Sequence, residues 1–82
     1  MAGPQQISDV ASLGRLIRQE RQAREFTLEG AAGLAGVGVR FLLELEHGKE
    51  TASLGKALQV LHRMGLEVWV APRGTPPWKD EL

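Results

Sequence analysis

The sequence contains no cysteine, and only 5% of its residues are aromatic. Without thiols, disulfides and zinc sites with cysteine ligands are excluded, which is typical of a protein in a reducing compartment. The sequence also has no net charge, because 10 Lys and Arg residues balance 10 Asp and Glu residues. A polycation that coats nucleic acid through bulk charge is therefore excluded, and any anion binding must depend on a local pattern of charge.

Long hydrophobic runs and targeting signals are absent from the sequence as well. No window approaches the roughly 18 apolar residues of a membrane span, and the first ten residues lack the basic and apolar regions of a signal peptide. We therefore expect a cytoplasmic protein with no membrane partner.

Catalytic patterns are missing too. A length of 82 residues fits one small domain and leaves no room for a separate catalytic domain. The sequence shows no Ser-His-Asp arrangement and no glycine-rich phosphate loop, and its two histidines lack partners at metal-ligand spacing. We expect no enzyme, no catalytic residue, no cofactor, no metal and no small-molecule substrate. A domain this small and without disulfides is expected to gain stability from a partner chain.

Helical periodicity is the main feature that is present. Helices are predicted from Ser8 or Asp9 to about Arg24, from Leu28 to Ala35 after Thr27 as N-cap, from Val39 to His47, and from about Ser53 to Met64. Gly48 and Gly65 end the last two. The apolar residues expected to pack are Val10, Leu13, Leu16, Ile17, Ala31, Ala32, Leu34, Ala35, Leu42, Leu45, Leu54, Ala57, Leu58 and Leu61.

After the last helix the pattern changes to strict alternation over residues 66–71, which predicts a β-strand that stops at Pro72. A single strand cannot satisfy its hydrogen bonds within a helical chain, so its partner is expected to be a second copy. The sequence thus divides into a helical domain (8–65), a dimerisation strand (66–71) and a C-terminal tail (72–82). The residues expected at the dimer interface are Leu66, Val68, Trp69 and Val70.

Two short helices and a glycine turn between Thr27 and Glu46 form a helix-turn-helix pattern. Spacing alone leaves open an ordinary small helical bundle. The residues themselves resemble the lambda-repressor-like (XRE) helix-turn-helix family over roughly residues 10–65. The resemblance rests on Leu13-Gly14-x-x-Ile17-Arg18-x-x-Arg21, Thr27, Ala32, Ala35-Gly36-Val37 and Leu42-x-x-Leu45-Glu46-x-Gly48-Lys49.

Within that family, the run from Val39 to Lys49 and the pattern up to Leu66 are most similar to antitoxins of the HipB and Y4mF type. This resemblance implies a mostly α, four- to five-helix domain whose C-terminal β-strand pairs across a homodimer. It also implies an antitoxin of a type II toxin-antitoxin system. Such a protein binds double-stranded operator DNA through the major groove as a bacterial autorepressor, is nucleoid-associated when bound, and neutralises a HipA-like Ser/Thr kinase toxin.

The resemblance assigns roles to individual residues. Arg40 would read guanine O6 and N7, whereas Thr27 and Lys49 would hold phosphates. A solvated surface charge remains an alternative for Arg40, and a plain N-cap for Thr27. The residues implied at the DNA are Thr27, Leu28, Gly38, Val39, Arg40, Leu43, Glu44 and Lys49.

Further roles follow from the same resemblance. Arg21 and Glu46 occupy the positions of a buried ion pair between the first helix and the recognition helix. Trp78 in the tail would contact the toxin, because aromatic anchors are typical hot spots of such contacts. Alternatively, Trp78 folds back on its own dimer.

The sequence also departs from the family at Leu28, Gly30, Ala31, Gly38 and Leu43, where polar or larger residues are usual. Missing hydroxyl and amide groups are expected to weaken phosphate and base contacts. Two other functions therefore stay open: a free-standing XRE-family transcriptional regulator, and an interaction module that has lost DNA binding. Residues 10–65 carry 8 basic and 6 acidic side chains, so the salt dependence of DNA binding is expected to be shallow.

Overall fold

The structure, a computed structural model, describes residues 3–74, and these contain four helices. They are α1 (Val10–Ala23), α2 (Leu28–Ala35), α3 (Val39–Glu46) and α4 (Leu54–Arg63). The mostly α prediction with four helices is confirmed, and no fifth helix occurs among the described residues. In residues 66–74, here called the C-terminal arm, the chain forms neither helix nor strand, so the predicted β-strand is not observed in this single chain.

Local hydrogen bonds explain where α1 and α4 begin. Asp9 caps α1, because its Oδ1 accepts from the Ser12 backbone N–H at 2.7 Å while Ser12 Oγ accepts from the Asp9 N–H at 3.1 Å. This reciprocal pair satisfies two backbone donors at a helix end. Ser53 caps α4 in the simpler way, since its Oγ accepts from the Lys56 N–H at 3.2 Å. These helix starts are therefore encoded locally.

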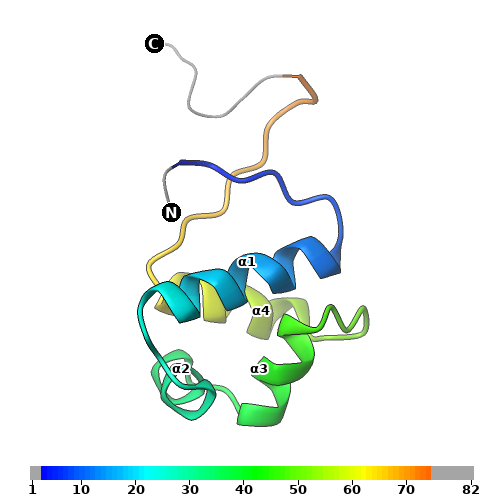
Figure 1. Cartoon of the computed structure of the whole chain (residues 1–82). Coiled ribbons are helices and arrows are strands. Elements are labelled where there is room, and N and C mark those ends of the chain that lie inside the picture. Colours follow the sequence, from blue (N-terminus) through cyan, green and yellow to red (C-terminus); the bar gives the residue numbers. More distant parts are fainter. Residues whose placement is uncertain (1–2, 75–82) are drawn as a thin grey trace.

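The helices pack so that α3 contacts both α1 and α2, and α2 also contacts α4. In Figure 1, α1 lies along the top of the helical part, α2 and α3 lie below it, and the arm leaves the end of α4 and runs away from the helices. The buried apolar residues form one core. They are Ile17, Ala31, Ala32, Ala35, Leu42, Leu45, Ala57, Val60, Leu61 and Met64.

Three leucines expected to pack are on the surface instead. Leu34 is 42% exposed, Leu58 43% and Leu54 70%. The buried residues of α4 are Ala57, Val60 and Leu61. Because a helix turns about 100° per residue, Leu54 and Leu58 point to one side of this buried stripe. The apolar pattern of α4 is wider than the face that the core covers.

Gly14 allows the closest approach between two helices. A Cβ atom at this position would overlap the backbone carbonyl oxygens of Leu45 and Glu46 at the end of α3. Any side chain here would therefore push α1 away from α3. The glycine sets the distance at which the first helix supports the third.

None of the helices in residues 3–74 is long and apolar enough to cross a membrane.

Candidate nucleic-acid interface

The turn between α2 and α3 spans residues 36–38 and is fixed by backbone and side-chain bonds. Gly36 has φ of 73°, a left-handed conformation that favours glycine. The Val37 N–H donates to the Ala32 carbonyl at 3.1 Å, and from α4 the side-chain amide of Gln59 donates to the Ala35 carbonyl at 2.8 Å. These contacts hold α2, the turn and α4 together, so the direction in which α3 leaves the turn is set by the fold.

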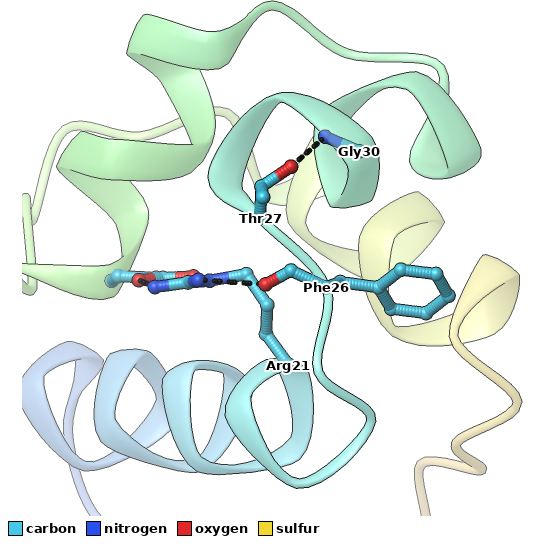
Figure 2. Close-up of polar contacts among 5 residues, drawn as sticks. Arg21, Phe26, Thr27 and Gly30 are labelled. Atoms are coloured by element: carbon cyan, nitrogen blue, oxygen red, sulfur yellow. Dashed lines mark hydrogen bonds and ion pairs between the residues drawn. The ribbon is translucent and has the colours of Figure 1, made fainter.

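An ion pair fixes the other end of α3. Arg21 Nε lies 2.7 Å from Glu46 Oε2, and Arg21 Nη2 donates to Glu46 Oε1 at 3.0 Å. Arg21 Nη1 also donates to the Phe26 carbonyl at 3.0 Å, as Figure 2 shows. The side chains are only 14% and 3% exposed, and the bond to Glu46 raises the pKa of Arg21 above its usual range. One guanidinium thus joins α1, the following turn and the C-terminal end of α3.

Thr27 and Leu28 begin α2. The Thr27 side chain is an N-cap, since its Oγ1 accepts from the Gly30 N–H at 3.0 Å (Figure 2). Thr27 is exposed beside the first backbone N–H groups of the helix, so capping and phosphate contact are geometrically compatible. Leu28 is half-buried and packs against the core. Of these two residues, only Thr27 presents a polar group to solvent.

One face of α3 is exposed along its first two turns. The helix begins after Gly38, which offers no side-chain cap. Val39 is 39% exposed and Leu43 40% exposed, whereas the Arg40 side chain is 89% exposed. Leu42 on the other face is fully buried. The exposed face therefore combines two apolar contacts with one long cation.

Glu44 brings the charged residues of this face together. Its Oε2 lies 3.3 Å from Arg40 Nε, and its Oε1 lies 3.0 Å from Lys49 Nζ in the loop after α3. The bonds from Lys49 and then from Arg40 hold the pKa of Glu44 below its usual range. At neutral pH the group is therefore a carboxylate between two cations, with a combined charge of one positive unit.

The residues expected at a dimer interface lie on the C-terminal arm. Leu66 is half-buried against the core, but Val68 is 57% exposed, Trp69 67% and Val70 96%. An open groove of about 540 Å³ lies between α4 and the start of the arm. It is lined by Leu58, His62, Leu66, Glu67, Val68 and Trp69. Trp78, expected to contact a toxin, lies outside the described residues.

Sequence reasoning missed two contacts that shape the interface. Gln59 bonds to a carbonyl 24 residues earlier, and no local pattern signals such a partner. The contact between Arg40 and Glu44 could have been found, because oppositely charged residues four apart on a helix are neighbours. Within residues 3–74, no three His, Cys, Asp or Glu side chains gather closely enough to hold a metal ion.

A short helix, a fixed turn and a second helix with an exposed face, supported by two further helices, define a helix-turn-helix domain. Comparison with known proteins agrees. The chain is 43% identical over 67 residues to the uncharacterized HTH-type transcriptional regulator y4mF of Sinorhizobium fredii (strain NBRC 101917 / NGR234), a match covering 82% of this chain and 84% of the relative. The chain therefore belongs to this family of helix-turn-helix transcriptional regulators.

Solved structures show the same fold. HipB in a HipB-O4 20mer complex superposes with a TM-score of 0.77 at 17% identity, covering 85% of this chain and 99% of that chain. The structure of a HipA-HipB-O2-O3 complex gives the same TM-score, identity and coverage. No family model matches the sequence. The predicted resemblance to XRE-type proteins with a HipB-like fold is confirmed.

Proposed function

We propose that this protein is a homodimeric repressor that binds operator DNA and serves as the antitoxin of a HipA-like Ser/Thr kinase. The observation that carries the DNA-binding part is the exposed face of α3, which the Arg21–Glu46 ion pair and the α2–α3 turn hold in a fixed direction. A recognition helix needs such support because its side chains must meet base edges within a groove about 12 Å wide.

The contacts with DNA follow from the positions described above. Arg40 is the one cationic side chain of α3, is exposed, and can donate two hydrogen bonds to one guanine. Thr27 at the start of α2 and Lys49 after α3 flank the helix and are suited to phosphates. Leu28, Gly38, Val39 and Leu43 supply no polar group, and Val39 and Leu43 are suited to thymine methyl groups. This mixture favours modest affinity that depends on two half-sites.

Dimerisation through the arm completes the proposal. Val68 and Val70 are exposed in the single chain, and burying apolar side chains of this size is favourable. Pairing of residues 66–71 with the same residues of a second copy would satisfy the backbone groups that face each other across the two arms. A dimer places two copies of α3 on one duplex, as operator half-sites require. The toxin-binding role rests on the HipA-HipB complex among similar structures and is proposed for Trp78.

A substitution at Arg40 tests the DNA-binding role. Arg40→Ala is expected to weaken binding to the preferred duplex by about 1 to 3 kcal/mol, because one bidentate base contact is lost. The duplex is first selected from a random library with the wild-type full-length chain, and binding is then measured by gel-shift titration. Arg15→Ala, which removes an exposed charge from α1, is the control and should change little. Equal affinity of Arg40→Ala and wild type would refute the assignment.

Co-purification tests the antitoxin role against the two alternatives. The full-length protein is mixed with a purified HipA-like kinase, and the complex is sought by size-exclusion chromatography, with Trp78→Ala as the comparison. A complex that Trp78→Ala weakens supports the antitoxin. DNA binding without a kinase complex favours a free-standing regulator, and a kinase complex without DNA binding favours an interaction module, which the exposed apolar Val39 and Leu43 also suit.

A further inference from the structure

Glu44 is the one acidic side chain on α3 that contacts both candidate DNA-binding cations in the described part of the chain. Its two carboxylate oxygens are divided between them, with Oε2 at 3.3 Å from Arg40 Nε and Oε1 at 3.0 Å from Lys49 Nζ. Arg40 lies one helical turn before Glu44, whereas Lys49 lies in the loop after the helix. The carboxylate therefore links two cations that would otherwise move independently.

The bond to Arg40 uses the nitrogen that base recognition does not need. Glu44 accepts from Nε, and no hydrogen bond occupies the two terminal nitrogens of Arg40 among residues 3–74. The Arg40 side chain is 89% exposed. Guanine O6 and N7 can accept from the two terminal nitrogens of one guanidinium. Glu44 can thus hold the plane of Arg40 while leaving its reading edge free.

The bond to Lys49 has a different consequence. The Lys49 ammonium has three donors and can bind a phosphate beside Glu44, but the Glu44 carboxylate offsets part of the Lys49 charge and itself repels phosphates. Both effects oppose binding to any duplex, whatever its sequence. A correct base contact by Arg40 offsets this cost only at the preferred site.

We propose that Glu44 is a positioning residue that sets the sequence discrimination of this protein, by orienting Arg40 towards guanine and by lowering the affinity for unrelated DNA. This inference rests on the proposed DNA-binding function. It differs from a purely structural role, in which Glu44 and Arg40 form an ordinary surface pair on a helix. Such a pair contributes little to stability and would leave DNA selectivity unchanged.

Glu44→Gln tests the proposal, because glutamine keeps the shape of the side chain and removes its charge. Binding is measured by fluorescence anisotropy with three duplexes at several KCl concentrations. They are the duplex that the wild-type chain selects from a random library, the same duplex with its most strongly selected guanine pair replaced, and an unrelated duplex. Glu25→Gln is the matched control, since it removes the same charge from the exposed turn between α1 and α2.

We expect Glu44→Gln to bind the unrelated duplex about three- to fivefold more tightly than wild type, with a steeper salt dependence. Discrimination against the replaced guanine should fall about tenfold. Glu25→Gln should resemble wild type in both measurements. If Glu44→Gln and Glu25→Gln behave alike, the inference is wrong while the DNA-binding proposal stands.

A double-mutant cycle with Arg40→Ala identifies the route of the effect. If Glu44 acts through Arg40, Glu44→Gln causes no further loss of guanine discrimination in the Arg40→Ala background. A loss that persists there would overturn the inference, because it would mean that Glu44 contacts a base directly, as a carboxylate can with cytosine N4. If the wild-type chain enriches no sequence from the library, the DNA-binding proposal fails and this inference falls with it.

Discussion

Two apolar regions of this molecule behave in opposite ways. In the helical domain, residues 8–65, Val60 is fully buried, whereas Val70 in the C-terminal arm is 96% exposed. The residue type is the same, so the difference lies in what each segment can pack against. Four amphipathic helices cover one another's apolar faces, but a single extended segment has no such neighbour.

The helical domain carries the contacts that stabilise the single chain, whereas the exposed arm is suited to association with a second chain. The helical domain has its own core, a largely buried ion pair and a close contact between α1 and α3. The arm contributes only Leu66 to that core. Changes in the helical domain should therefore alter the stability of each chain, whereas changes in the arm should alter the proposed dimer.

Loss of the buried ion pair should destabilise the helical domain most. Glu46→Ala leaves the Arg21 guanidinium, only 14% exposed, without its carboxylate. We expect a loss of about 3 to 5 kcal/mol in the free energy of unfolding, because a buried charge without its partner is strongly unfavourable. Urea denaturation at fixed protein concentration measures this loss. Glu50→Ala, an exposed acidic residue in the next loop, is the control and should change stability by no more than about 0.5 kcal/mol.

Charged residues in the arm should weaken the proposed dimer. Replacing Val68 and Val70 together by aspartate is expected to weaken the dimer by about 2 to 3 kcal/mol, or about 30- to 150-fold in Kd, because charges would have to be buried at the proposed strand pair. Analytical ultracentrifugation over a dilution series measures the association. Ile7→Asp tests whether any exposed apolar residue gives the same result. An unchanged dimer in the arm variant would rule out this interface.

Two glycines of the helical domain should respond to alanine in opposite ways. Gly14→Ala should destabilise the protein by about 1 to 3 kcal/mol, since its new Cβ meets the backbone of α3. Gly33→Ala should instead stabilise it by about 0.5 to 1 kcal/mol, because that Cβ has no atom within 4 Å and alanine favours a helix. Thermal unfolding of both variants checks the sign. If both substitutions change the melting temperature in the same direction, the close approach of α1 and α3 at Gly14 is contradicted.

The smallest effect concerns the pH dependence of the α1 cap. Hydrogen bonds from Ser12 hold the pKa of Asp9 below its ordinary value of 3.8. The charged form therefore stabilises the folded state fully above that ordinary value, and this contribution disappears as the pH falls through the lower folded pKa. Asp9→Asn keeps a capping oxygen but cannot titrate. The variant should lose less stability than wild type between pH 4 and pH 2, as measured by thermal melts.

Much of the fold could be predicted from the sequence because its signals are local. Asp9, Thr27 and Ser53 act as N-caps, and the turn at Gly36 lies where the glycines indicate. The candidate interface is less predictable. The exposed positions on α3 follow from its helical period. That period does not predict that the Glu44 carboxylate contacts both Arg40 and Lys49. The strand and Trp78 remain predictions, because one needs a second chain and the other lies beyond the described residues.

The four helices, their caps and the helix-turn-helix spacing are encoded locally, since each depends on residues within one or two helical turns. Three other features depend on how the helices pack in three dimensions. They are the choice of covered apolar side chains, the need for glycine at position 14, and the contacts by which Gln59 and Arg21 fix the two ends of the helix-turn-helix unit. These features join segments about 20 to 30 residues apart. Their geometry depends on how whole helices cross, which no local pattern of residues specifies.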